Sequence, residues 1–231
     1  MEEKRVEEYL IMEKLTNNMA SKIAKELELD NDNRDIIAYG MFALISIALS
    51  IISIIIFGMI FHVAIEALII CFTGSILRKY SGGVHASSPS RCIIIGTIVC
   101  IGQAIIFSLL IGPVITKSLV IILGIVVFVM SYYFLYKLAP VDSIAKPIKK
   151  REKIIRMKKR SIFVLSIYLI IVIINIFMHV YSQKKGSLIY SLCIYGGVTW
   201  QVFTLTKMGN NIMNKIDSFF SQIARFIKGV K

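Results

Sequence analysis

Charged side chains are almost absent from long stretches of this 231-residue chain. Residues 36–77 contain one formal charge, Glu66, and similar apolar runs recur further along the sequence. Hydrophobic residues make up 56% of the chain, whereas a soluble domain of this size is about 45–50% apolar. A bilayer core is crossed by about 20 helical residues. The scarcity of charge therefore excludes an ordinary soluble domain and favours a membrane protein.

Cysteine is also scarce, and its placement is uninformative at three of four positions. Cys71, Cys100 and Cys193 lie inside apolar runs, where a free cysteine behaves as a small hydrophobic residue. The four cysteines have no paired spacing, so we expect neither a disulfide framework nor a zinc site, and we expect no cofactor. Residues 1–35 are highly charged, so no cleavable signal peptide is expected there.

The apolar runs predict an all-α fold, a polytopic helical bundle in one membrane domain. About six transmembrane or re-entrant segments are expected, and the second is the candidate for a re-entrant one. They fall at 36–77 (two segments, turning near Gly58), 92–112, 118–138, 161–181 and 188–206. Amphipathic segments flank them at 1–35 and 207–231. In the first, Leu15, Met19, Ile23 and Leu27 form one helical stripe, which suits either the bilayer surface or the protein's own cytoplasmic side.

The net charge of +13 fits either nucleic acid binding or a cytoplasmic membrane face. Position decides between these readings, because 24 of the 27 Lys and Arg residues lie in alternate loops and the two termini. With six crossings, the positive-inside rule then puts both termini and the polar loops 78–91 and 139–160 in the cytoplasm. We therefore expect the lipid bilayer, and no nucleic acid, as a partner.

One polar loop, 78–92, has the residues of a reactive site. Its sequence is RKYSGGVHASSPSRC. Ser88 and Pro89 are typical of a helix start, which places Cys92 in a first helical turn. The helix dipole and Arg91 favour the thiolate there, and His85 lies close enough in sequence to act as its base.

The same loop resembles the signature of the accessory gene regulator protein B family, the AgrB proteins. The resemblance rests on Arg78, Gly82-Gly83, His85-Ala86 and Cys92 between two membrane segments, and on the Ala139-Pro140 and Lys146-Pro147 pairs. It covers roughly residues 30–210. Family members are membrane cysteine endopeptidases of quorum sensing in Gram-positive bacteria.

The resemblance implies a function as well as a fold. The catalytic pair would be His85 and Cys92, acting on an AgrD-like precursor peptide with an acidic C-terminal tail. Cleavage would release the tail and leave the signal segment bound to the enzyme as an acyl thioester. The signal would then close into a thiolactone or lactone ring. A homodimer in the cell membrane of a Gram-positive bacterium is also implied.

Other residues are candidates for supporting roles. Gly82, Gly83, Arg78 and Arg91 could support the oxyanion or the loop, and Asp142 could orient His85. Recognition of the acidic tail is assigned to Lys146, Lys149, Lys150 and Arg151. The competing explanation for this basic stretch is membrane topology alone.

Two other functions fit a chain of this kind. One is a small membrane transporter, with Glu66, Gln103 and Asn175 along its path, and the other is a non-catalytic membrane scaffold. Replacement of Cys92 discriminates between them, because a transporter should tolerate the change and a peptidase should not.

Overall fold

The computed structural model describes residues 2–84, 89–141 and 151–229, and all secondary structure elements in these ranges are helices. Eight are α-helices: α1 (Glu2–Glu26), α2 (Asn31–Ile60), α3 (Ala64–Ser81), α4 (Pro89–Ile105), α5 (Lys117–Leu138), α6 (Arg151–Ser182), α7 (Gly186–Phe203) and α8 (Lys207–Gly229). A π-helical stretch, Ile106–Ile111, and a 3-10 turn, Gly112–Val114, continue α4. The predicted all-α bundle is confirmed.

Four helical stretches are long and apolar enough to cross a membrane. They are Asn31–Ile60, Arg91–Val114, Lys117–Leu138 and Arg151–Ser182, and the bent pair α7–α8 makes a fifth if it is counted as one span. Their outer faces carry many exposed apolar side chains, for example Ile122, Ile125 and Val129 on α5. Apolar surface of this extent is unfavourable in contact with water and favourable in contact with lipid chains. The chain is a membrane protein of the multi-pass kind.

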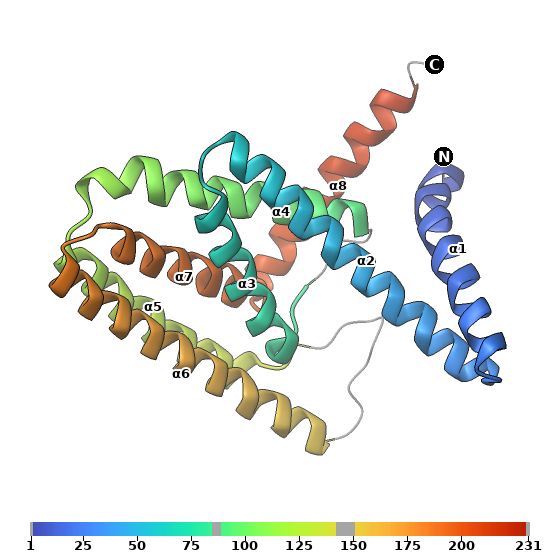
Figure 1. Cartoon of the computed structure of the whole chain (residues 1–231), viewed down its shortest axis with the longest axis horizontal. Coiled ribbons are helices and arrows are strands. Elements are labelled where there is room, and N and C mark those ends of the chain that lie inside the picture. Colours follow the sequence, from blue (N-terminus) through green and yellow to red (C-terminus); the bar gives the residue numbers. More distant parts are fainter. Residues whose placement is uncertain (1, 85–88, 142–150, 230–231) are drawn as a thin grey trace.

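Helix α7 forms the centre of the bundle (Figure 1) and contacts α3, α4, α5 and α6. Every residue from Ser191 to Val198 is buried. Gly197 allows α7 and α3 to pack closely, because a Cβ atom there would lie 2.7 Å from the carbonyl oxygen of Ile70 on α3. Buried tyrosines tie the other helices in: Tyr195 donates to the Val120 carbonyl of α5, and Tyr168 of α6 donates to the Thr73 carbonyl of α3.

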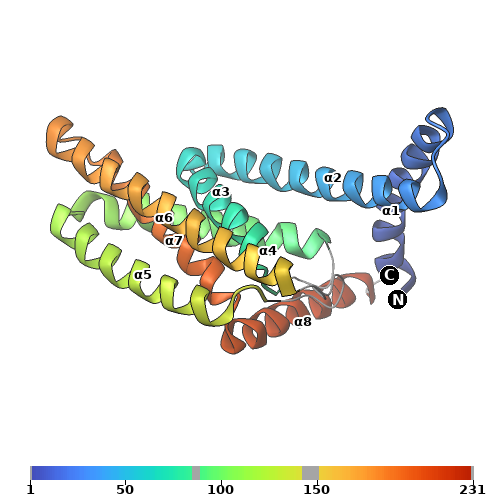
Figure 2. The same cartoon turned by 90° about the horizontal axis from the view of Figure 1, so that it is seen from below.

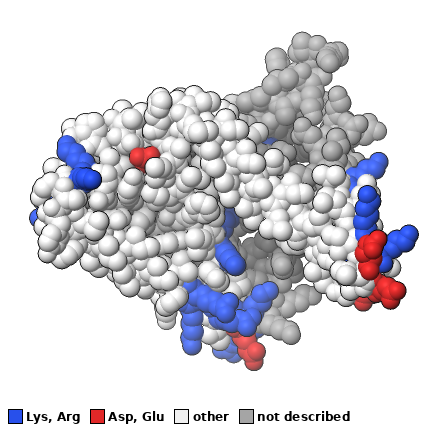
Figure 3. Space-filling view, viewed as in Figure 1, with Lys and Arg blue, Asp and Glu red and all other residues white. Residues whose placement is uncertain are grey.

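The ends of several elements meet at one end of the bundle. The end of α3, the start of α4, the end of α5, the start of α6 and helix α8 all lie toward the same side in two perpendicular views (Figures 1 and 2). The described parts of both termini also lie on that side. Figure 3 shows Lys and Arg gathered at the start of α6 and near the α1–α2 junction, with broad uncharged surface over the bundle.

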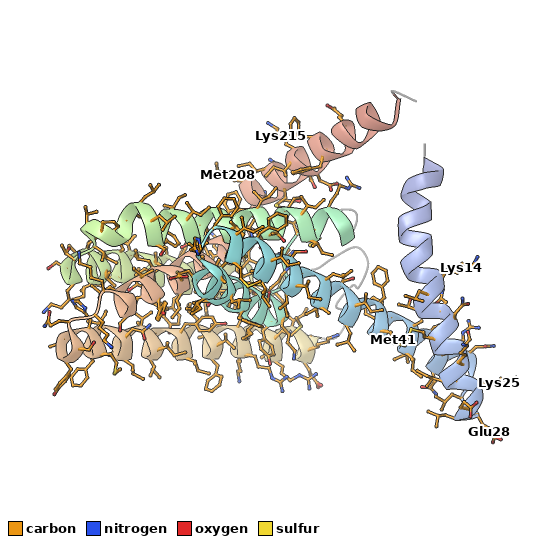
Figure 4. All side chains as sticks on the ribbon, turned by 45° about the horizontal axis from the view of Figure 1, so that its top comes forward. Lys14, Lys25, Glu28, Met41, Met208 and Lys215 are labelled. Carbon is orange, nitrogen blue, oxygen red and sulfur yellow. The ribbon has the colours of Figure 1, made fainter. Side chains whose placement is uncertain are left out.

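Two helices extend from the bundle (Figure 4). Helix α1 packs on α2 through a face of small residues, Thr16, Ala20 and Ala24, which are buried. The predicted apolar stripe of Leu15, Met19 and Ile23 lies on the neighbouring face and is exposed, and Leu27, just beyond the end of α1, is exposed as well. Helix α8 is bent by 91° from α7.

Element boundaries differ from the prediction in two places. The turn after α2 falls at residues 61–63, a few residues beyond the expected Gly58, and His62 takes a positive φ of 55° there. Helix α6 begins at Arg151, ten residues before the expected membrane segment. The basic residues 151–160 are therefore helical rather than part of a loop.

Candidate functional site

The Gly82-Gly83 pair forms the turn that ends α3. Both glycines have positive φ angles, 70° at Gly82 and 131° at Gly83, a region that favours glycine. A Cβ atom at Gly82 would collide with the carbonyl of Val141, whose own backbone N–H donates to Ser81 at 2.9 Å. The segment after α5 therefore lies directly against this turn, and only glycine fits between them.

A buried amide on α7 holds the same turn. Gln201 is 1% exposed, and its Nε2 donates to the Ser81 hydroxyl at 2.9 Å and to the Gly82 carbonyl at 2.7 Å. Thr204 is also buried; its hydroxyl donates to the Gln201 carbonyl at 2.7 Å, and its own carbonyl accepts from the Val84 N–H at 3.3 Å. The end of α7 thus makes hydrogen bonds to three residues at the end of α3 and just after it, Ser81, Gly82 and Val84.

Sequence reasoning missed Gln201 and Thr204. The one available signal was an amide inside an apolar run, and Gln103 and Asn175 gave the same signal. Only the fold brings Gln201 to the Gly82-Gly83 turn, across 119 residues of sequence.

Arg78 connects the two sides of the reactive loop. Its guanidinium donates to the Val84 carbonyl and interacts electrostatically with the sulfur of Cys92. The side chain lies at the polar end of α3, outside the four candidate spans. Burial lowers the pKa of Arg78, and the nearby Cys92 opposes that shift. An arginine remains protonated through such shifts, so a fixed positive charge stands beside the thiol.

Cys92 lies in the first turn of α4, as predicted from Pro89 at the helix start. It is half-buried. Arg91 reaches α8: its Nη1 lies 2.8 Å from the Asp217 carboxylate and donates to the Asp217 carbonyl at 3.0 Å. Of the two arginines predicted to support this loop, the structure places Arg78 toward the thiol and ties Arg91 to α8.

Several predicted site residues lie outside the described residues. These are His85, Asp142, Lys146, Lys149 and Lys150. Arg151 is described: it is the first residue of α6 and is exposed. The described residues contain no cluster of His, Cys, Asp or Glu suited to a metal ion.

The third turn of α6 passes close to the end of α3. The guanidinium of Arg160 is 5.9 Å from the ring centre of Tyr80, which is two residues before Gly82. Lys158 lies over the ring of Tyr136 at the end of α5, 4.2 Å from its centre. The basic stretch 151–160 of α6 therefore ends beside Tyr80, next to the reactive loop.

Comparison with known proteins decides the family. The family model described as Accessory gene regulator B matches residues 16–205, which include the whole reactive loop and α7. The chain belongs to the accessory gene regulator B family. Membership links it to quorum sensing and to the processing of an AgrD-type peptide at a membrane.

Two relatives from Clostridium perfringens support this membership, and both are named as AgrB-like proteins. The one from strain 13 / Type A, named AgrB-like protein 2, is 43% identical over 215 residues, which cover 92% of this chain and 100% of the relative. The one from strain SM101 / Type A is 43% identical over 220 residues, with the same coverage of both chains. No solved structure matches the chain.

Proposed function

We propose that this protein is a membrane cysteine endopeptidase that removes the acidic C-terminal tail of an AgrD-like precursor and promotes ring closure of the signal. Cys92 is the nucleophile and His85 the general base. The observation that carries the proposal is the arrangement of the loop: Cys92 lies half-buried in the first turn of α4, and the Arg78 guanidinium donates to the Val84 carbonyl. Val84 directly precedes His85. The buried Arg78 at the end of α3 therefore holds the loop next to the proposed base.

The reaction follows from these groups. The Cys92 sulfur attacks the scissile carbonyl carbon and forms a C–S bond, while His85 takes the thiol proton. The peptide C–N bond then breaks, and the tail leaves as an amine with the proton that His85 returns. A Cys or Ser of the signal segment attacks the thioester, closes the ring and releases Cys92. The acyl group stays activated throughout, so ring closure requires no ATP.

Two features support this chemistry at the described residues. The Gly82-Gly83 turn, with both φ angles positive, has the backbone freedom that an oxyanion-binding loop requires, and the Gly83 N–H is the candidate donor, since the Gly82 N–H already donates to the Arg78 carbonyl at 2.9 Å. The guanidinium of Arg78 donates to the Val84 carbonyl and so holds the loop residue that directly precedes His85. Water must be kept out for cyclisation to prevail over hydrolysis. A site at a membrane surface, covered by the bound peptide, meets that requirement.

Tail recognition and assembly belong to the same proposal. The basic residues Lys146, Lys149, Lys150 and Arg151 attract the acidic tail, and Arg151 begins the helix whose basic face reaches Tyr80 beside the turn. The working unit is a homodimer, with both termini and the reactive loop in the cytoplasm.

The test uses purified protein in liposomes with a cognate precursor peptide. Cys92→Ala and His85→Ala should each abolish release of the tail, because nucleophile and base act as a unit. Cys92→Ser should allow an acyl-enzyme to be trapped as an ester. Cys71→Ala is the matched control, since Cys71 is a free thiol inside the membrane bundle and should be dispensable. Normal cleavage by Cys92→Ala would refute the proposed peptidase and favour a transporter or scaffold.

A further inference from the structure

Helix α8 has three distinct faces. Met208 and Phe219 are apolar and exposed, at 66% and 59%. A second face turns Gly209 and Met213 inward, where both are buried. The third face is polar and exposed, and comprises Asn210, Asn211, Asn214 and Ser218. A helix with an apolar face, a protein-facing edge and a wet polar face is typical of the membrane–water interface.

The direction of α8 agrees with that position. Helix α7 packs among the other helices of the bundle, and α8 is bent from it by 91°. If α7 runs across the bilayer with its neighbours, α8 must run along the bilayer surface (Figures 1 and 2). Met208 and Lys215 point away from the bundle in Figure 4. The helix is therefore held in the surface plane by lipid on one side and protein on the other.

Asp217 connects this surface helix to the start of α4. One nitrogen of Arg91 contacts both the carboxylate of Asp217, at 2.8 Å, and its backbone carbonyl, at 3.0 Å. The side chains of Arg91 and Asp217 are only 11% and 15% exposed, so the ion pair is sheltered from water. Sheltered pairs are much less screened by salt than surface pairs, so this contact can hold the two helices together. Arg91 immediately precedes Cys92.

We propose that Asp217 is a positioning residue for Cys92: it binds Arg91, anchors the first turn of α4 to the membrane-surface helix α8, and so fixes the depth of the thiol at the interface. The proposal rests on the peptidase function. The family match ends at residue 205, so it assigns no role to α8. A peptide substrate bound to the same membrane surface would then lie at the same depth as the thiol. Proximity of this kind contributes to catalysis only while the reacting groups are held in register.

Charge reversal tests the pair directly. Asp217→Arg and Arg91→Asp should each lower kcat for precursor cleavage by about tenfold or more, as expected for the loss of a sheltered ion pair. The double variant, Arg91→Asp with Asp217→Arg, should recover most of the lost rate, which independent structural damage would not do. Asn214→Arg is the matched control, since it adds a positive charge to the exposed polar face of α8 and should leave kcat unchanged.

A second measurement separates this proposal from the peptidase function. Alkylation of Cys92 by a maleimide, followed by mass spectrometry of the Cys92 peptide, should become several-fold faster in both single variants and return to the wild-type rate in the double variant. Asp217→Asn, which keeps the side-chain shape, covers the case in which the reversals fail to insert. If wild-type protein cleaves no precursor, the peptidase function fails, while the alkylation pattern still judges the pair. Single variants that match the wild type in both assays, or a double variant no better than the singles, would overturn the proposal.

Discussion

Gln201 stabilises the shape of the reactive loop, although its amide side chain takes no part in the proposed reaction. Its two hydrogen bonds reach the Ser81 hydroxyl and the Gly82 carbonyl, and the amide is almost completely buried. Gln201→Glu keeps the size of the side chain and replaces the donor with an acceptor that faces a carbonyl. An unsatisfied buried polar group costs about 1–3 kcal/mol. That energy would be relieved by displacement of the turn.

We therefore expect Gln201→Glu to lower kcat by about tenfold or more, with little change in KM, because the loss falls on loop geometry rather than on peptide binding. Cleavage kinetics in liposomes would measure both constants. Gln103→Leu is the control, since it also removes an amide from an apolar helix but lies away from the turn. Wild-type kcat in Gln201→Glu would show that the turn holds its shape without this amide.

At the residue scale, local backbone features could be predicted from the sequence, whereas contacts between residues far apart in the chain could not. The Ser-Pro pair correctly predicted a helix start that puts Cys92 in the first turn of α4. The glycine pair indicated unusual backbone, and both residues have positive φ. The ion pair of Arg91 with Asp217, 126 residues away, was not predicted. No local pattern encodes such a partner.

The same contrast holds at the scale of elements. Hydropathy predicted about six segments, because lipid requires long apolar helices with few charges. The described residues hold four helical stretches that could cross a membrane, or five if the bent pair α7–α8 is counted as one span, and α3 is not among them. Hydropathy missed the early start of α6, since basic residues 151–160 look like a loop when only hydrophobic periodicity is counted. It also identified the apolar stripe of α1 but not the small-residue face, Thr16, Ala20 and Ala24, which packs on α2. Close packing of small residues leaves a weak signal in composition.

The beginning of α6 carries a prediction about substrate recognition. Neutralising Lys149, Lys150 and Arg151 together, to Gln, should raise KM for the precursor far more than it lowers kcat. The reason is that an acidic tail would lose Coulomb attraction without any change at the thiol. The difference from wild type should shrink as salt is raised, because the Debye length is only about 8 Å at physiological ionic strength.

Kinetics at two salt concentrations would measure this effect. Lys184→Gln with Lys185→Gln is the control, because these lysines lie in the connection between α6 and α7, at the other end of α6 from Arg151. An unchanged KM in the triple variant would leave those basic residues with topology as their only role.

For the whole molecule, the partition of basic residues predicts orientation. An impermeant maleimide added to intact cells should leave Cys92 unlabelled, and the same reagent added to inverted vesicles should label it, because the positive-inside rule predicts a cytoplasmic position for the loop-bearing end of the bundle. A cysteine introduced at Lys184, between α6 and α7, should give the reverse pattern. Labelling of Cys92 from outside would invert the topology and move the proposed chemistry to the other side of the membrane.

The hydrogen bond from Gln201 to Ser81 spans 120 residues of sequence, and this has a consequence for biosynthesis. The ribosome completes the cysteine and histidine of the loop long before it makes the amide that shapes the turn. During that interval the nascent chain carries a thiol but not the contacts that hold its surroundings. The proposed active site is therefore complete only after α7 has been made and inserted, and a product truncated before Gln201 would lack the hydrogen bonds that shape the turn.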